Sequence, residues 1–358
     1  MCFSSWASRI PAIQIKLGLS NAALGGVLLG LPTGLLISLP IAGWLVAKYG
    51  SRFVVIGSSL LYACTLPLLG IAQNTGELLS CLFVFGMGGN MLNISMNTQA
   101  VGTENLYQRT IMASYHGLWS LAGFTGAAIG TLFVSLDILP WIHFALIGFT
   151  AIVILITASP FLLKEDLNRN EQQPVFAKPD RTIISLGLIA FCSMICEGAM
   201  FDWSGVYFQK VVQPRNGLVT AGYTAFMCTM ATGRFLGDWV TMKVGKQKTL
   251  LGSGILTAAG LLIAVIYPYF QTAVFGFLLV GLGVSSVVPL IYSSAGKSRL
   301  LSPGVAIAAV STIGYLGFLF GPPFIGFIAQ LSTLRWSLGL IALLGASIAI
   351  ISSRSRFD

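Results

Sequence analysis

The segment KEDLNRNEQQPVFAKPDR (residues 164–181) is the only long polar stretch of the chain, and eight of its eighteen residues are charged. The rest of the chain is dominated by apolar stretches: 55% of the 358 residues are hydrophobic and only 9% are charged. Soluble domains carry about 25% charged residues, so this chain cannot cover a surface that faces water. The composition therefore predicts an all-α protein that lies in a lipid bilayer.

Charge-free runs flank this connector on both sides. A helix needs about 20 apolar residues to cross a bilayer. The run 249–296 is too long for one crossing, and we expect Tyr267-Pro268-Tyr269 to divide it into two. Residues 182–209 form one more span, which only Glu197 and Asp202 interrupt. Eleven full spans are predicted, at residues 17–47, 53–76, 78–103, 110–136, 138–163, 182–209, 216–233, 249–296 (two), 300–334 and 336–353.

The amino terminus offers too little chain for a further crossing. Only residues 1–8 precede Arg9, and no charged region or cleavage site marks them as a signal peptide. Residues 1–6, Met-Cys-Phe-Ser-Ser-Trp, read like the outer end of a helix whose beginning is missing. We therefore expect a chain truncated within its first helix, and a natural eleven-span protein is the alternative.

The basic residues give the orientation. The net charge of +9 does not indicate a nucleic-acid partner, because Lys and Arg lie in short connectors between apolar runs. With the connector in the cytoplasm, the five outer basic residues are Arg9, Lys16, Lys210, Arg215 and Arg335. The fourteen inner ones are Lys48, Arg52, Arg109, Lys164, Arg169, Lys178, Arg181, Lys243, Lys246, Lys248, Lys297, Arg299, Arg354 and Arg356. The bias predicts a multi-pass protein of a bacterial inner membrane with a cytoplasmic carboxyl terminus.

The connector separates two similar halves. We expect an amino-terminal helical half at residues 1–163, the cytoplasmic connector at 164–181 and a carboxyl-terminal half at 182–358. A shift of 195 residues places Lys48-x-Gly50 on Lys243-x-Gly245, and it also superposes the glycines at 86 and 88 on those at 281 and 283. Duplicated halves are typical of secondary transporters, which bind substrate between the halves near the bilayer midplane.

Several stretches resemble the major facilitator superfamily. Its loop between helices 2 and 3 normally reads Gly-x-x-x-Asp-Arg-x-Gly-Arg-Arg, and the chain has Gly43-Trp-Leu-Val-Ala47-Lys48-Tyr-Gly50-Ser51-Arg52, with Ala47 in place of the acidic residue. The second half matches the same loop motif only in part, through Asp238, Lys243, Gly245 and Lys246. The chain also resembles an uncharacterised bacterial branch near the fucose-permease-like sugar:proton symporters. The stretches that carry this resemblance are 5–13 (SWASRIPAI), 197–203 (EGAMFDW) and 314–326 (GYLGFLFGPPFIG). The resemblance implies the major facilitator fold, with two six-helix halves, a mostly missing helix 1 and a monomeric state.

Charged residues inside the membrane are the first functional candidates, because each costs about 2.5–3.5 kcal/mol on insertion scales. Glu197 lies well inside the span 182–209 and is our candidate for proton coupling. The alternative is a carboxyl that bonds a neighbouring helix and never titrates. Asp202, near the outer end, is expected to gate together with Lys210 or with a partner in helix 1 or 2.

Arg234 and Asp238 are four residues apart, on one helix face near its inner end. The resemblance implies that charges near this loop hold a cytoplasmic gate closed in one state of the cycle. Under that implication the residues of the cytoplasmic gate are Lys48, Arg52, Arg234, Asp238 and Lys243, whereas Asp202 is the gating residue expected at the outer surface. A local ion pair at the headgroup level is the alternative.

Polar and aromatic side chains give candidates for the solute cavity. Asn90, Asn93 and Asn97 form one helical stripe, and amides suit hydroxyl-bearing solutes because they donate and accept at once. Hydrogen bonds between helices are the alternative role of this stripe. Trp203, Tyr207 and Tyr315 could stack on a sugar ring. His116 could shuttle protons near neutral pH, or it could serve as an interhelical hydrogen-bonding residue.

The sequence has no enzyme signature. It lacks the Gly-x-x-x-x-Gly-Lys-Ser/Thr loop of an ATP motor, and no metal or cofactor set is expected, although Cys192 and Cys196 share a helix face. We expect proton-coupled uptake of a small polar, sugar-like solute by alternating access. A proton-coupled drug or metabolite exporter of the same fold is one alternative. A non-transporting membrane sensor or a decayed fragment is the other.

Overall fold

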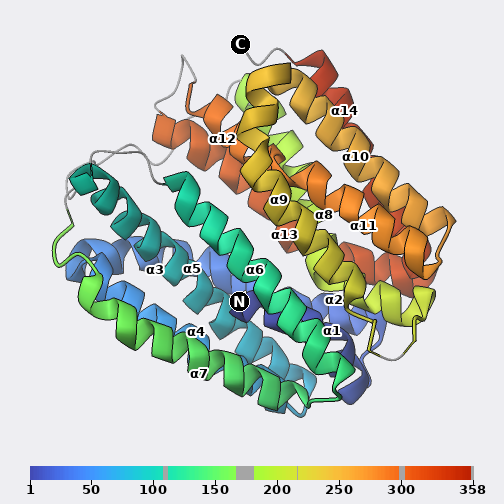
Figure 1. Ribbon diagram of the computed structural model, residues 1–358, viewed down its shortest axis with the longest axis horizontal. Coiled ribbons are helices and arrows are strands. Elements are labelled where there is room, and N and C mark those ends of the chain that lie inside the picture. Colours follow the sequence, from blue (N-terminus) through green and yellow to red (C-terminus); the bar gives the residue numbers. More distant parts are fainter. Residues whose placement is uncertain (108–111, 167–180, 216, 298–302, 356–358) are drawn as a thin grey trace. The chain divides into compact units, whose positions relative to one another are not determined.

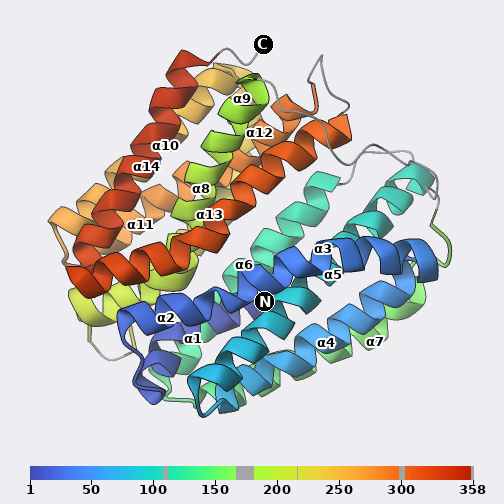
Figure 2. The same cartoon turned by 180° about the vertical axis from the view of Figure 1, so that it is seen from behind.

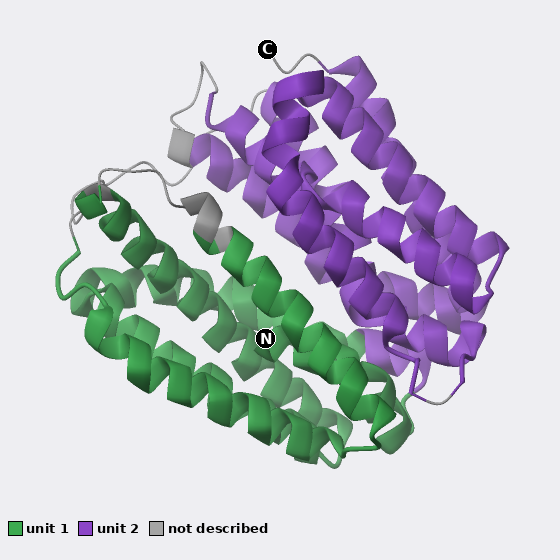
Figure 3. Ribbon diagram, in the orientation of Figure 1, with its two compact units in different colours: residues 1–19, 26–171 green, residues 20–25, 172–358 purple. Residues whose placement is uncertain are grey.

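The computed structural model describes residues 1–107, 112–166, 181–215, 217–297 and 303–355, and all regular structure in these ranges is helical (Figure 1). The helices form two compact units (Figure 3). Unit 1 comprises residues 1–19 and 26–171, and unit 2 comprises residues 20–25 and 172–358. Most of the connector predicted at 164–181 lies outside the described residues, so the predicted domain boundaries remain predictions.

Unit 1 is built around the pair α3 and α5, which pack closely on each other (Figure 2). α4 packs on α5 and α7, and the short helix α1 packs on α6 and α7. The boundary between the units falls inside α2 (Asn21–Leu28). The helices of unit 1 are α1 (Cys2–Lys16), α3 (Gly30–Tyr49), α4 (Ser51–Ile71), α5 (Thr75–Tyr107), α6 (Met112–Ser135), α7 (Pro140–Ala158) and the 3-10 turn η1 (Ser159–Phe161).

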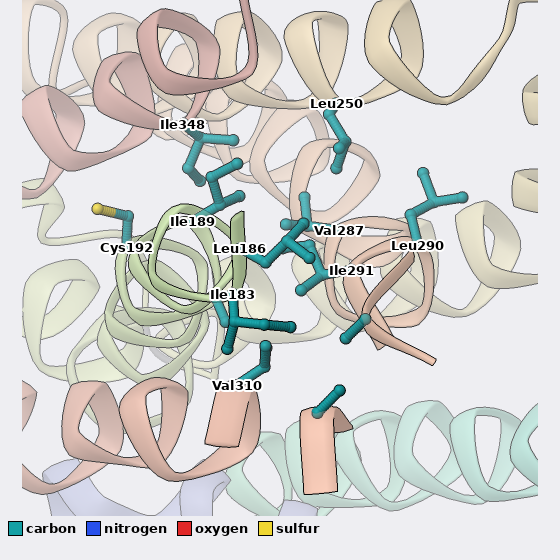
Figure 4. Packing of buried hydrophobic residues seen from close by; sticks show 13 residues of the cluster. Ile183, Leu186, Ile189, Cys192, Leu250, Val287, Leu290, Ile291, Val310 and Ile348 are labelled. Atoms are coloured by element: carbon teal, nitrogen blue, oxygen red, sulfur yellow. The ribbon is translucent and has the colours of Figure 1, made fainter. Parts of the chain in front are cut away.

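Unit 2 surrounds α8 (Arg181–Tyr207), which packs on α9, α12, α13 and α14. Ile183, Leu186 and Ile189 of α8 anchor an apolar cluster that also takes Val287 and Ile291 from α12 (Figure 4). A central helix of this kind is apolar on all sides. The other elements are the π-turn η2 (Phe208–Val212), α9 (Ala221–Val244), α10 (Lys246–Ile266), α11 (Phe270–Ser285), α12 (Val287–Ala295), α13 (Pro303–Leu331) and α14 (Leu334–Arg354).

Ten helices of the described residues are long and apolar enough to cross a membrane. The predicted span 216–233 overlaps α9, which begins later, at Ala221, and continues to Val244, so that it takes in the charged residues Arg234, Asp238 and Lys243. α9 is not among the ten. The predicted break of the run 249–296 is confirmed, because α10 ends at Ile266 and α11 begins at Phe270. The all-α membrane fold predicted from the composition is therefore confirmed.

The repeated Lys-x-Gly motif makes the same structure in both units. Gly50 and Gly245 both have φ of +86°, each as the single residue between two long helices. Side chains strain this left-handed backbone, so the turn favours glycine. Before each turn a lysine lies over the ring of the tryptophan four residues earlier: Lys48 Nζ is 4.7 Å from the Trp44 centroid, and Lys243 Nζ is 4.1 Å from that of Trp239. These tryptophans are also 195 residues apart.

The two helices that follow these turns are α4 and α10. A basic side chain caps the carboxyl-terminal end of each. Lys16 Nζ donates to the backbone oxygens of Gly70 and Ala72 at the end of α4, at 2.9 and 2.8 Å. Arg335 donates to the oxygen of Val265 at the end of α10, at 2.8–3.0 Å. The last carbonyls of a helix have no partner within it and carry partial negative charge, so a cation stabilises both ends.

Close helix packing gives a first stability prediction. A Cβ at Gly260 on α10 would collide with the backbone oxygen of Gly276 on α11, and the reverse also holds. We expect Gly260→Leu to cost about 1–3 kcal/mol or more, because the two backbones would have to separate. Thermal unfolding in detergent measures this cost.

Gly252→Leu is the matched control on the same helix, because no heavy atom lies within 4 Å of a Cβ placed there. It should leave the midpoint of unfolding nearly unchanged. Equal shifts in the two variants would contradict the close contact between α10 and α11.

Candidate functional site

Unit 2 contains a buried ion pair between two helices. Glu197 on α8 accepts from Arg234 on α9, with 3.3 Å between Oε1 and Nη2. Their side chains are 8% and 20% exposed. The sequence predicts Glu197 as an intramembrane charge. The spacing within α9 suggests Asp238 as a partner of Arg234. The structure joins Arg234 to a different helix through Glu197.

Two tyrosines lie close to this pair. Tyr292 on α12 and Tyr315 on α13 interact electrostatically with Glu197, and Tyr292 also hydrogen-bonds Ser311. The ring of Tyr315 lies 6.5 Å from that of Phe318, between centroids. Four helices therefore bring one carboxylate, one guanidinium and two phenols together in a mostly apolar part of unit 2.

Arg234 also borders a pocket of about 450 Å³ within unit 2. The pocket has a polar side formed by Asp238, Lys246 and three serines, which are Ser285, Ser286 and Ser293. α9 can approach α11 here because Gly233 and Gly237 lie directly against Ser285 and Ser286. Arg234 thus lies between the buried carboxyl of Glu197 and a pocket that has one polar side.

The other predicted gating residues are spread over both units. Lys48 and Lys243 each lie over a tryptophan of their own helix, and Arg52 is half-buried at the start of α4. Asp202 is half-buried on α8, and no described residue forms a hydrogen bond or ion pair with it. Lys210 bonds Oδ1 of Asn21 on α2, at 2.7 Å. The gating roles of these residues remain predictions.

The asparagine stripe of α5 divides into two parts. Asn90 is buried and donates through Nδ2 to the oxygen of Leu35 and to Oγ of Ser38 on α3, at 3.1 and 2.9 Å. Asn93 is exposed within the structure, and its Oδ1 accepts from Asn97 at 3.2 Å. Asn90 thus serves the packing of α3 on α5, whereas Asn93 and Asn97 bond each other on a less buried part of the helix, and their role in the cavity remains a prediction.

The predicted aromatic residues also differ in exposure. Trp203 and Tyr207 have no exposed surface, and the Tyr207 hydroxyl donates to the oxygen of Ala264 at 2.7 Å. Tyr315 is only partly buried. Of the three rings, Tyr315 has exposed surface in this structure and the other two have none, and the stacking roles remain predictions. The side chain of His116 lies outside the described residues.

Two polar groups escaped the sequence analysis, and both lie in unit 1. Gln99 on α5 bonds both backbone groups of Leu163 and Oγ of Ser51, at 2.7–3.1 Å, and Ser51 in turn bonds the carboxylate of Asp166. This network holds the start of the connector against the first turn of α4. The sequence signal for this network was the amide of Gln99, a polar side chain in an apolar helix that lies off the asparagine stripe.

The second missed group is a buried contact between Arg9, which is predicted on the outer side, and His143. Both are buried: Arg9 is 3% exposed, His143 is 0% exposed, and Arg9 Nε donates to His143 Nδ1 at 3.1 Å. The position of a basic residue along the chain does not show whether its side chain is buried in the protein.

No cluster of three His, Cys, Asp or Glu residues that could hold a metal ion occurs in the part of the chain that the structure describes. The six cysteines are free, and Cys192 and Cys196 of α8 are buried. The site chemistry available to unit 2 is thus that of an ionisable carboxyl, its counter-charge and neighbouring phenols.

Comparisons with known proteins concern the whole chain and its family. The sequence profile of the Major Facilitator Superfamily matches residues 1–299 and again residues 216–357. An uncharacterised MFS-type transporter of Yersinia pestis is 33% identical over 346 residues, which cover 97% of this chain and 90% of that protein.

Two solved structures share the fold. The Escherichia coli fucose:proton symporter has a TM-score of 0.63 and 18% identity, with 99% of this chain and 97% of that chain covered. The nucleoside transporter NupG has a TM-score of 0.74 and 13% identity, with 99% and 96% covered. With a family profile over nearly its whole length and a relative at 33% identity, the chain belongs to the major facilitator superfamily of membrane transporters.

Proposed function

We propose that the chain is a proton-coupled secondary transporter that moves a small polar solute by alternating access, with Glu197 as the proton-carrying group. The buried Glu197–Arg234 pair is the observation that carries this proposal. Ionisable residues inside a membrane protein are costly and are by default functional. A carboxyl held by one guanidinium has two states of different charge, which is what proton coupling requires.

The ionised and the protonated forms of Glu197 act differently on Arg234. The ionised carboxylate holds the guanidinium through a charge-assisted hydrogen bond. Protonation of Glu197 removes the negative charge and frees Arg234 toward the polar pocket that it borders. Proton loading would thus move a positive charge between the buried site and the pocket of Asp238 and Lys246. This is a local electrostatic change of the kind that biases a two-state protein.

The solute is proposed to be rich in hydroxyl groups. Asn93 and Asn97 supply amide donors and acceptors, and Tyr315 supplies a partly exposed ring near Glu197. Both structural neighbours are named for such solutes, fucose and nucleosides. These likenesses support the class of solute, and the particular compound is left to experiment.

Uptake into proteoliposomes tests the proposal. We expect labelled L-fucose, D-galactose, D-gluconate or uridine to accumulate when the vesicle interior is made alkaline, and we expect a protonophore to abolish accumulation. With one proton per solute, one pH unit supports about tenfold accumulation, because it supplies about 1.4 kcal/mol. Solute that only equilibrates, with or without the gradient, would contradict coupling. Accumulation only with an acidic interior would instead support the exporter.

A further inference from the structure

Unit 1 contains a buried positive charge for which the described residues provide no acidic partner. Arg9 lies in the middle of α1, where α1 packs on α6 and α7, and it is 3% exposed. Its printed partner is a neutral ring nitrogen, Nδ1 of His143, and no carboxylate of the described residues lies within ion-pair distance. Buried charges are normally paired, so the uncompensated Arg9 requires an explanation.

The groups around Arg9 that lack partners are donors. Arginine stays protonated in proteins, so His143 Nδ1 must accept and the ring proton must lie on Nε2. That Nε2 is buried and has no hydrogen-bond partner among the described residues, and the same holds for Nη2 of Arg9 and Nε1 of Trp6. Three N–H donors and one full positive charge therefore lack an acceptor.

These donors belong to one neighbourhood. Trp6 and Arg9 are three residues apart on α1 and hence on one face of that helix. The ring of Trp6 lies 6.4 Å from that of Phe144, and the ring of His143 lies 5.6 Å from it. Ser5, four residues before Arg9, adds a buried hydroxyl that also lacks a partner.

We propose that this donor cluster binds an anion, and that the anion is a carboxylate group of the transported solute. Arg9 would supply the charge and a forked pair of donors, the geometry that suits a carboxylate. His143 Nε2 would donate alongside it. The inference rests on the proposed transport function and narrows its substrate class to hydroxylated acids such as sugar acids.

Equilibrium binding tests this without any gradient. Purified protein in detergent micelles is titrated calorimetrically with gluconate, an open-chain hydroxylated carboxylate, and with glucose, a cyclic sugar that has hydroxyl groups but no carboxylate. We expect gluconate to bind about tenfold more tightly or better, since each tenfold corresponds to one good charge-assisted contact. Arg9→Met should erase the difference, and His143→Phe should reduce it. Lys248→Met, which removes an exposed positive charge from α10, should preserve it.

The outcomes separate the alternatives. Equal binding of gluconate and glucose to the native protein would overturn the inference, and so would an unchanged preference in Arg9→Met. Chloride that binds as tightly as gluconate and competes with it would assign the cluster to an inorganic ion and overturn the solute carboxylate. If Arg9→Met does not fold, the thermal midpoint of the native protein decides, because gluconate should raise it and glucose should not.

The same titration distinguishes this inference from the proposed coupling. Glu197→Gln protein should bind gluconate as the native protein does, because Glu197 belongs to unit 2 and the donor cluster to unit 1. Loss of proton-driven uptake with intact gluconate preference would therefore leave the anion site standing. Proton-driven uptake of neutral sugars without any gluconate preference would sustain coupling and overturn the anion site.

Discussion

Glu197→Gln is expected to abolish accumulation of solute against a gradient while leaving exchange of labelled for unlabelled solute intact. Glutamine keeps the shape and the hydrogen bond to Arg234 but cannot load or release a proton. At one pH unit the native protein should accumulate solute about tenfold, and the variant should reach a ratio of about one. Parallel uptake and counterflow assays in proteoliposomes measure both quantities.

Glu165→Gln is the matched control, because it removes an exposed carboxyl near the start of the connector. It should accumulate solute like the native protein. Retention of full accumulation in Glu197→Gln would exclude Glu197 from coupling. Loss of both accumulation and exchange in well-folded protein would make Glu197 a residue needed for binding or movement instead.

Arg234→Met is expected to destabilise unit 2 by about 3 kcal/mol when Glu197 stays ionised, because removal of one partner strands a buried charge. The double variant Glu197→Gln/Arg234→Met should regain most of that loss, since neither charge then remains. Unfolding midpoints in detergent for the native protein, both single variants and the double variant form a complete cycle.

The exposed-charge variant Lys248→Met controls for the general loss of a positive charge. It should shift the midpoint little, because surface charges contribute little to stability. Strictly additive effects of the two single variants would show that Glu197 and Arg234 do not interact. The proposed proton switch would then lose its counter-charge.

Much of the fold follows from the sequence, because crossing a bilayer imposes a length and a composition on each helix. The runs 53–76 and 138–163 correspond to α4 and α7, and Tyr267-Pro268-Tyr269 falls at the break between α10 and α11. The run 17–47 corresponds to one candidate span, Asn21–Tyr49, although within it α2 and α3 are separate elements that meet at Leu29. A run without charges carries no signal for such an internal break.

The sequence indicates which charged residues belong to the site more readily than it indicates which of them contact each other. Glu197 and Arg234 stand out as charges in apolar helices, but sequence spacing identifies neighbours only along one helix. Their meeting depends on how α8 and α9 are rotated about their axes, which packing sets. Arg9 illustrates the same limit, because its burial follows from the position of α7 and His143, 134 residues further along the chain.

The most direct test of the central claim is the pH of a weakly buffered medium around proteoliposomes when solute is added. With a solute that the uptake assay has identified, we expect the medium to become alkaline as protons enter with the solute. We expect no such change with Glu197→Gln, even though exchange continues. Solute entry into native vesicles with no pH change in the medium would contradict proton-coupled uptake.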